Sequence, residues 1–201
     1  FAALLEKVGA GKDEVPEAVA RLAAAGRKAG IALASHDDAS PEMRAEFRAL
    51  GVRIAEFPTT VETALAARAA GDSTIFGAPN VVRGGSHLNC PGAAEMVAAG
   101  ACDILASDYY YPALYLAPFR LAKDGVCPLG KAWELVSTAP AAALGLSDRG
   151  GIEAGRRADL VLIDDSGALP QIAGVFVAGR PAHLSGRLAE TAQAALAAAA
   201  E

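Results

Sequence analysis

Four polar side chains stand at the ends of four short apolar segments, and their types suit hydrolysis assisted by a metal ion. They are His36, Glu56, Asn80 and Asp108. Neutral imidazole and carboxylate are suitable ligands for a divalent cation, and a carboxylate can accept the proton of an attacking water. We therefore predict that His36 binds a metal ion and that Asp108 belongs to the same site.

Both residues have a simpler interpretation. A lone histidine at a strand end is often a packing or capping residue, and an aspartate ahead of a helix is often its N-cap. Two acids follow His36 directly, and Asp37 or Asp38 is predicted to orient the imidazole from behind. Polar residues at four successive strand ends favour one shared site over four separate caps.

A second group of residues lies in "GAPNVVRGGSH" and suits an anion. Consecutive glycines let backbone N–H groups approach phosphate oxygens, and a guanidinium offers them a fork of donors. Taken alone, "RGGS" is simply a flexible loop in most proteins. The residues predicted to contact substrate phosphates are Arg83, His87, Asn80 and Ser86.

The elements that must position these residues follow a βα period. Strands are expected at 31–35 (buried on both faces), 52–57, 73–76 and 103–107, each followed by a helix, with one long loop at 77–92. Such an order implies parallel strands with right-handed crossovers. It fits a small open doubly wound sheet or half of an eight-stranded barrel, and both place chemistry at the carboxyl ends of the strands.

Capping residues mark two of the helix starts. Ser40 is expected to be an N-cap with Pro41 at the first helical position, and Gly51 to close that helix. Thr59 and Glu62 have the spacing of a capping box for the next helix.

The last third of the chain changes character. Residues 131–137 are expected to form a helix with Trp133 on its apolar face, and 152–164 and "GVFVAGRP" to form strands joined to a small β appendage. We divide the chain into a barrel-like part (1–148), a returning β segment (149–186) and a C-terminal helix (187–201).

Composition limits the class of protein. A hydrophobic fraction of 53% supports a real core, and a net charge of −5 disfavours nucleic acid as a partner. No apolar run is long enough for a membrane helix, and three cysteines without C-x-x-C spacing suggest reduced thiols in the cytoplasm. The opening "FAALLEKVGAG" has neither an initiator Met nor a signal-peptide pattern, which suggests part of a longer protein.

Several motifs of the sequence resemble motifs of the amidohydrolase superfamily. The run "TAPAAALGL" followed by G-I-x-A-G-x-x-A-D-L-V-L-I-D is similar to the family's closing signature, and "DILASDYY" to its eighth barrel strand. More narrowly, "LASHDD", "EFPTT", "FGAPNVVRGGSH" and "LASDYY" in this order resemble the diphosphatases of the carbon–phosphorus lyase pathway. The resemblance covers about residues 14–186.

The resemblance implies a fold and a reaction. The fold would be α/β, the C-terminal half of a (β/α)8 amidohydrolase-type barrel followed by part of a small β-sandwich. The reaction would be hydrolysis of α-D-ribose 1-methylphosphonate 5-triphosphate to the 5-phosphate and pyrophosphate, with zinc, manganese or iron as the divalent cofactor. Asp108, at the end of the eighth strand, would bind the same metal ion as His36 and accept the proton of the attacking water. Water would attack the phosphorus nearest the ribose, while Arg83 and His87 hold the departing pyrophosphate. Another amidohydrolase activity, on a cyclic amide or by ring deamination, and a non-enzymatic scaffold remain alternatives.

The chain departs from the family pattern in one important respect. His36, His87 and His183 are its only histidines, so the His-x-His of the first barrel strand is absent, as is an assignable bridging lysine. Glu56 occupies a position where many relatives have histidine, so either Glu56 is a ligand or that ligand position is vacant, and we place Glu56 among the residues that support the ligands. We therefore expect this chain to need a preceding barrel half, in the same chain or supplied by another copy, because a half-barrel exposes two strand edges.

Overall fold

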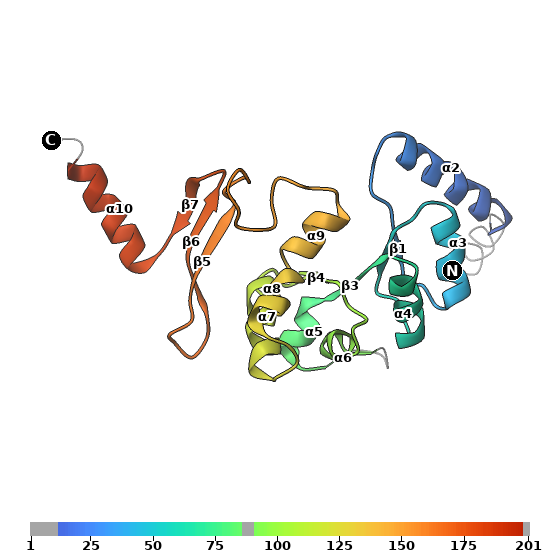
Figure 1. Ribbon diagram of the computed structural model, residues 1–201, viewed down its shortest axis with the longest axis horizontal. Coiled ribbons are helices and arrows are strands. Elements are labelled where there is room, and N and C mark those ends of the chain that lie inside the picture. The colour runs from blue at the N-terminus through green and yellow to red at the C-terminus, as the bar shows by residue number, and fades with distance from the viewer. Residues whose placement is uncertain (1–11, 86–90, 199–201) are drawn as a thin grey trace, which may run out of the picture.

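A computed structural model describes residues 12–85 and 91–198 and arranges them around two sheets (Figure 1). The first sheet is parallel, with its strands side by side in chain order: β1 (Ala34–His36), β2 (Ile54–Glu56), β3 (Ser73–Gly77) and β4 (Ile104–Ala106). The second sheet is antiparallel and also in chain order: β5 (Leu160–Asp164), β6 (Gln171–Val177) and β7 (Arg180–Leu184). The predicted α/β class with a parallel sheet is confirmed.

Helices connect the parallel strands and continue beyond them. Their bounds are η1 (Lys12–Glu14, a 3-10 helix), α2 (Val15–Lys28), α3 (Pro41–Ala49), α4 (Val61–Ala69), α5 (Ala78–Arg83), α6 (Ala93–Ala98), α7 (Ala113–Lys123), α8 (Leu129–Glu134), α9 (Thr138–Ala143) and α10 (Gly186–Ala198). None of these described helices is both long and apolar enough to cross a bilayer.

The predicted start of α3 is confirmed. Ser40 has extended backbone, and its hydroxyl accepts a hydrogen bond from the Met43 amide at 3.2 Å, with Pro41 opening the helix. Gly51 follows the helix with a φ of 86°, a left-handed conformation that glycine adopts without a Cβ penalty.

The predicted capping box is wrong by one residue. Thr60 is the N-cap of α4, and its hydroxyl accepts a hydrogen bond from the Thr63 amide at 3.1 Å. Thr59 instead donates its amide to the carbonyl of Asp38 at 3.1 Å, which joins the segments that follow β1 and β2. A contact between two loops therefore uses the residue that the local pattern assigns to the cap.

Two other expectations need correction. Residues 31–33 precede β1 instead of forming it, and Ile31 is 62% exposed, because β1 is an outer strand with one described neighbour. The expected long loop at 77–92 begins with helix α5, which ends where Gly84 turns left-handed at a φ of 81°. This helix fixes Asn80 and Arg83 relative to the end of β3.

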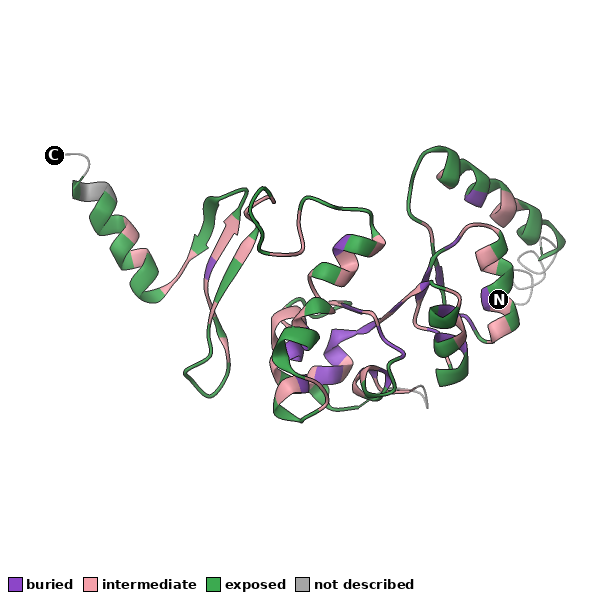
Figure 2. Cartoon of the chain, in the orientation of Figure 1, coloured by how far each residue is buried: buried purple, intermediate pink, exposed green. Residues whose placement is uncertain are grey.

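Helices cover one face of the parallel sheet. Thr74, Phe76 and Leu105 are buried, and Phe76 and Leu105 join a core that includes Met96 of α6 and Leu121 of α7. Much of that core is alanine, which lets the helices approach the sheet closely. Buried residues concentrate here, whereas the second sheet and α10 are largely exposed (Figure 2).

The other face of the sheet carries the polar residues. Side chains alternate along a strand, so residues one position away from the buried Ser35 and Ala55 face the opposite side. His36 and Glu56 therefore lie on the face that the helices leave open. At the strand edges, β1 and β4 are outermost, and the Leu105 amide donates to the Leu135 carbonyl at 2.9 Å, which covers part of the β4 edge.

The second sheet is a hairpin extended by one strand. Ala178 and Gly179 join β6 to β7 with φ values of 50° and 77°, the left-handed pair of a type I′ turn. The expected strand at 152–164 shortens to β5, and Ile152 is 89% exposed. In Figure 1 the antiparallel sheet and α10, which begins at Gly186, lie to the left of the parallel sheet.

The two described cysteines should differ in reactivity. Cys102 is 6% exposed, and its burial raises the pKa of its thiol, as does the nearby Asp103 carboxylate. Cys127 is partly exposed, and burial raises the pKa of its thiol as well. The thiolate is the nucleophile, so iodoacetamide at pH 8 should alkylate Cys127 well before Cys102 in the folded protein. Peptide mass spectrometry over time measures both rates, with urea-unfolded protein as the control. Equal rates in the folded protein would contradict the burial of Cys102.

Candidate active site

His36 ends β1 with its ring in contact with a carboxylate. Nδ1 lies 3.0 Å from Oδ2 of Asp37, and the two side chains are 57% and 66% exposed. A carboxylate on one ring nitrogen holds the imidazole in one tautomer and leaves Nε2 available to a metal ion. This contact has the geometry that an orienting carboxylate needs.

Phe57 packs between His36 and the end of β3. Its ring meets the His36 ring edge-on, with centroids 5.4 Å apart. A Cβ placed on Gly77 would lie 3.4 Å from the Phe57 ring and 3.7 Å from the Asn80 amide nitrogen. Phe57 therefore links the polar residues of β1 to those that follow β3.

Three residues after the strand ends have left-handed backbone. Asp37, Phe57 and Asp108 have φ values of 58°, 52° and 49°, and they follow β1, β2 and β4. This conformation costs an L-residue roughly 1–2 kcal/mol and is least unfavourable for Asp and Asn. Backbone strain of this kind is concentrated at functional sites, and here it follows the ends of three of the four parallel strands.

Asp38 has a structural environment that differs from that of Asp37. Its side chain is fully buried, where Oδ2 accepts hydrogen bonds from Ser35 Oγ at 2.8 Å and from Arg44 Nη1 at 2.9 Å. Arg44 of α3 also donates to the Val52 carbonyl at 2.7 Å. Asp38 thus points into the packed side of the sheet, and it anchors the turn that carries His36 and Asp37.

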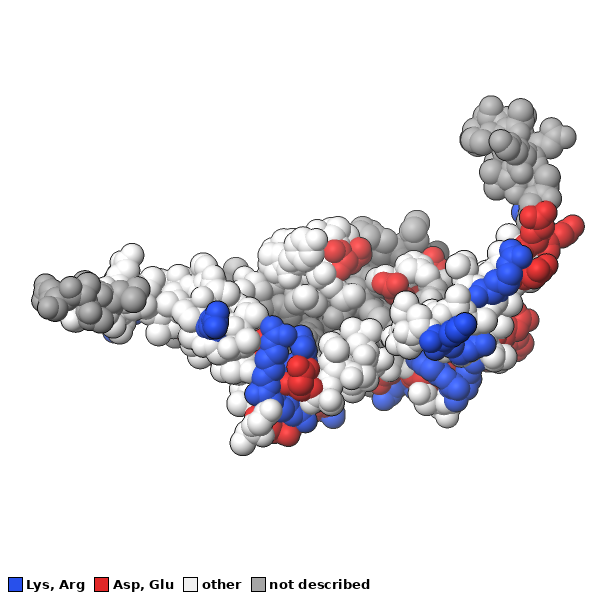
Figure 3. All heavy atoms as spheres, turned by 90° about the horizontal axis from the view of Figure 1, so that it is seen from above, with Lys and Arg blue, Asp and Glu red and all other residues white. Residues whose placement is uncertain are grey.

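The same arginine approaches a second buried acid. Arg44 Nε lies 3.5 Å from Oδ2 of Asp72, whose side chain is fully buried and also pairs with Arg48 and Arg53. One group of basic side chains lies on the side of the molecule that carries α2 and α3 (Figure 3). This network ties α3 to the beginning of β3 and holds the β1–β2 end of the sheet in place.

Glu56 is the partner of His36 across the β1–β2 ladder. The two Cα atoms are in register, and the next partner of Glu56 is Ile75 of β3. Register partners in a parallel sheet place their side chains side by side on one face, at a spacing of about 5 Å. Glu56 therefore lies beside His36 on the same face of the sheet.

Asp108 lies two residues beyond β4 and does not cap a helix. It is exposed, and α7 begins at Ala113 with Pro112 in the capping position and no side-chain cap. The interpretation of Asp108 as an N-cap is therefore wrong. Its carboxylate is available at the carboxyl end of β4.

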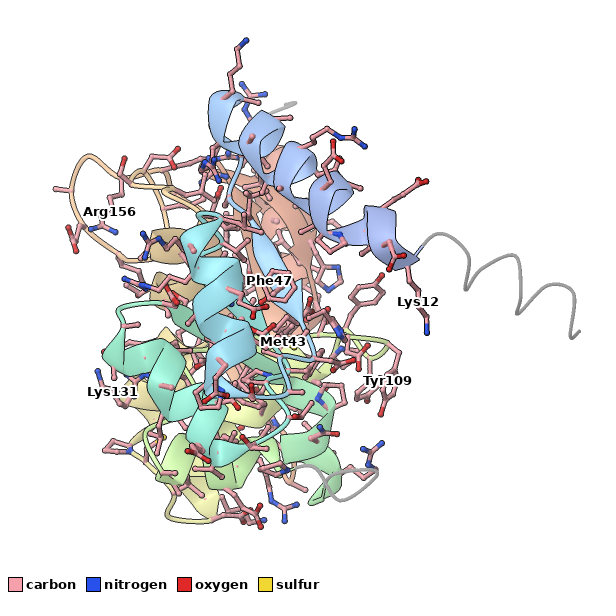
Figure 4. All side chains as sticks on the ribbon, turned by 90° about the vertical axis from the view of Figure 1, so that its right-hand side faces the viewer. Lys12, Met43, Phe47, Tyr109, Lys131 and Arg156 are labelled. Atoms are coloured by element: carbon pink, nitrogen blue, oxygen red, sulfur yellow. The ribbon has the colours of Figure 1, made fainter. Side chains whose placement is uncertain are left out.

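Arg83 joins α5 to the segment after β4. Its Nη2 donates to Asn80 Oδ1 at 2.8 Å, and its Nη1 donates to the hydroxyl of Tyr109 at 2.6 Å. Tyr109 adjoins Asp108 in the chain, and its side chain projects at the margin of the molecule in Figure 4. The hydrogen bond thus connects a guanidinium on α5 to the segment after β4 that also carries Asp108.

The predicted residues fall into two groups along the strand ends. His36, Asp37 and Glu56 lie around β1 and β2, whereas Asn80, Arg83 and Asp108 lie around β3 and β4. Ser86 and His87 are outside the described residues. The strands β1 and β4 are separated by three inter-strand spacings, roughly 14 Å along the sheet.

The side chains at the site are of the types that bind a divalent metal ion, but too few of them lie close together to hold one. His36 presents an oriented imidazole and Asp108 an exposed carboxylate, as a divalent ion requires. Within residues 12–85 and 91–198, however, no three His, Cys, Asp or Glu side chains come close enough to hold a metal. Further ligands would have to come from outside this part of the chain.

Sequence patterns did not indicate three residues that the structure brings to the site. Phe57, Arg44 and Tyr109 make contacts that depend on distant partners, and each belongs to a residue type that is common in packed cores or on surfaces. The one local signal was the position of Phe57 and Tyr109 directly after Glu56 and Asp108.

Comparison with known proteins supplies the relatives of the chain. The model of the family described as "Amidohydrolase family" matches residues 6–183. The chain is 52% identical over 143 residues to the α-D-ribose 1-methylphosphonate 5-triphosphate diphosphatase of Escherichia coli (strain K12), a match that covers 70% of this chain and 38% of that protein. It is also 50% identical over 59 residues to an adenine deaminase of Methylobacterium sp. (strain 4-46), covering 29% of this chain and 10% of the deaminase.

Solved structures with the same fold are more distant in sequence. A prolidase complexed with N-methylphosphonate-L-proline matches with a TM-score of 0.60 at 17% identity, over 83% of this chain and 48% of the other. An amidohydrolase from Thermotoga maritima MSB8 matches with a TM-score of 0.58 at 17% identity, over 78% of this chain and 44% of the other. The chain thus spans less than half the length of the relatives it matches.

Proposed function

The chain belongs to the amidohydrolase family, and on that premise we propose that it carries part of the active site of a metal-dependent diphosphatase. The substrate would be α-D-ribose 1-methylphosphonate 5-triphosphate, and the products the 5-phosphate and pyrophosphate. The observation that carries the proposal is the guanidinium of Arg83, which neutral partners hold near the ends of β3 and β4 through a hydrogen bond to the segment that carries Asp108. The name of the Escherichia coli relative supports the choice of substrate.

The proposed chemistry assigns a task to each group of residues. Water attacks the phosphorus nearest the ribose, the bond from that phosphorus to the bridging oxygen breaks, and pyrophosphate leaves. Asp108 accepts the proton of the water, and Arg83, with Asn80 beside it, binds oxygens of the departing pyrophosphate. In-line positioning and neutralisation of phosphate charge supply most of the acceleration in reactions of this type.

A divalent cation would be held in part by Nε2 of His36 and by Asp108. Closure of the sheet into a barrel would curve the ends of β1 and β4 toward one mouth and shorten the roughly 14 Å that separates these strands along the sheet. When bound, the cation would lower the pKa of water and polarise a P–O bond. Asp37 keeps the His36 ring in the required tautomer, and Asp38 with Arg44 keeps the turn in place. Metal analysis of the purified protein will show whether the cation is zinc, manganese or iron.

The proposal includes a larger assembly. The parallel sheet would be the C-terminal half of a (β/α)8 barrel, the antiparallel sheet part of a β-sandwich, and the other barrel half would come from preceding residues or from another copy. The open sheet face with His36 and Glu56 would then line the barrel mouth. We propose a cytoplasmic location, where thiols such as Cys102 stay reduced.

Product analysis of the protein at its full natural length tests this function. Phosphorus NMR should show pyrophosphate and a ribose 5-phosphate product from the triphosphate. Release of inorganic phosphate alone would contradict the proposed position of attack. Failure to hydrolyse the triphosphate, with ammonia release from adenine, would instead support the deaminase suggested by the second relative.

Replacing Arg83 by alanine should mainly raise KM for the triphosphate. Loss of one exposed arginine–phosphate contact is expected to cost about 1–2 kcal/mol of binding, which is roughly a 5- to 30-fold increase in KM. Steady-state kinetics measure the effect. Lys131→Ala is the matched control, because Lys131 pairs with Glu134 on the exposed surface of α8 and should leave KM unchanged. A loss confined to kcat would argue against a ground-state phosphate contact.

A further inference from the structure

Arg83 is held differently from most arginines in the described chain. Most of the others pair with carboxylates, as Arg44 does with Asp38 and Arg68 with Asp103. Within the described ranges, no carboxylate oxygen lies within 4.0 Å of the Arg83 guanidinium, and its two side-chain partners are the neutral oxygens of Asn80 and Tyr109. Neutral partners fix the orientation of the guanidinium without cancelling its charge.

The two partners leave donors available for a ligand. A guanidinium has five N–H groups, and two of them are used by Asn80 and Tyr109. The three that remain have no partner among the described residues and can bind an anion. Because the Tyr109 oxygen accepts from Arg83, its own O–H proton is available to donate to the same anion.

The partners also come from two separate elements. Asn80 lies one turn before Arg83 on α5, and its carbonyl accepts from the amides of Gly84 and Gly85 at 3.1 and 3.2 Å. Tyr109 belongs to the segment after β4, next to the left-handed Asp108. The hydrogen bond from Arg83 to Tyr109 therefore links the charged group on α5 to the segment that carries the candidate base.

We propose that Tyr109 is a positioning residue that aims Arg83 at a polyphosphate and adds one hydroxyl donor to it. This inference rests on the proposed function and deepens it, since it assigns the recognition of the pyrophosphate leaving group to Arg83 and Tyr109 together. Tyr109 is 65% exposed, so its substitution by phenylalanine removes the hydroxyl without disturbing the core.

Kinetics of Tyr109→Phe separate this role from a structural one. KM for the triphosphate should rise 3- to 10-fold while kcat changes less than twofold and urea unfolding is unchanged. Tyr111→Phe is the matched control, since Tyr111 lies in the same segment with a 78% exposed side chain and should leave KM unchanged. The inference would be overturned if KM of Tyr109→Phe equalled that of wild type, or if KM of Tyr109→Phe and of Tyr111→Phe changed by the same factor.

A double-variant cycle tests whether Tyr109 acts through Arg83. Arg83→Ala combined with Tyr109→Phe should raise KM by less than the product of the two single effects, because part of the Tyr109 effect requires the guanidinium. Multiplicative effects would overturn the positioning role.

Direct binding distinguishes failure of the inference from failure of the proposed reaction. Calorimetry with inorganic tripolyphosphate, at a fixed free concentration of divalent metal, should show 3- to 10-fold weaker binding to Tyr109→Phe than to wild type. That result in a protein without diphosphatase activity would refute the reaction and support the anion site. Equal binding by the two proteins, or no binding by wild type, would refute the site itself.

Discussion

Replacing Arg44 by methionine should lower the free energy of unfolding by about 3–5 kcal/mol, the range for breaking a buried ion pair. Arg44 is 2% exposed, and it is the closest cationic partner of Asp38, whose carboxylate is fully buried. Asp72, also buried, would lose one of its cationic neighbours. Methionine fills a similar volume, so the loss reflects uncompensated charge more than a cavity. Urea unfolding of the full-length protein measures it.

Arg53→Met is the matched control for this prediction. Arg53 lies 3.5 Å from the same Asp72 carboxylate, but its side chain is 56% exposed. Exposed ion pairs contribute about 0–1 kcal/mol, so this variant should unfold close to wild type. Adding Asp38→Asn to Arg44→Met should restore part of the loss. Equal destabilisation by the two arginine variants would show that burial of the Asp38–Arg44 pair is not the cause.

Asp108→Asn should reduce kcat of the full-length protein by a factor of about 10²–10⁴, the range for loss of a general base. An amide is nearly the same size as the carboxylate but cannot take the proton of the attacking water. Asparagine also tolerates the left-handed φ of 49° at this position, so the fold should be retained. Steady-state kinetics and circular dichroism measure the two effects.

Metal analysis adds a second observable to this prediction. His36→Ala removes an imidazole ligand and should lower the metal content of the purified protein, as should Asp108→Asn to a smaller degree. Asp37→Ala should weaken metal binding while leaving some metal bound, because only the orientation of the ring is lost. Unchanged activity and metal content in Asp108→Asn would remove Asp108 from its assigned role.

The order of elements was predictable from local pattern. The βα period, the glycines after helices and the Ser40-Pro41 start each depend on residues close together in sequence, and all are present in the structure. The hairpin at Ala178-Gly179 follows from turn chemistry in the same way. The expected pairing of His36 with a neighbouring acid was also a local inference, because Asp37 is adjacent.

Contacts between distant segments account for what was missed. Thr59 does not cap α4 as predicted, because its amide donates a hydrogen bond to the carbonyl of Asp38, 21 residues earlier in the chain. Whether Asp37 or Asp38 would face the histidine depended on Arg44 of α3, which draws Asp38 into the interior. No local pattern reports which of two adjacent acids has a buried partner.

By itself, the sequence determined the α/β class, the succession of strands and helices, and the placing of His36, Glu56, Asn80 and Asp108 near the carboxyl ends of parallel strands. The tertiary structure alone decided which of these side chains meet, because that depends on ladder register, left-handed turns and the packing of helices on one sheet face. It set Glu56 beside His36 and joined Arg83 to Tyr109. Periodicity and capping act over a few residues, whereas these contacts depend on segments brought together only when the chain folds.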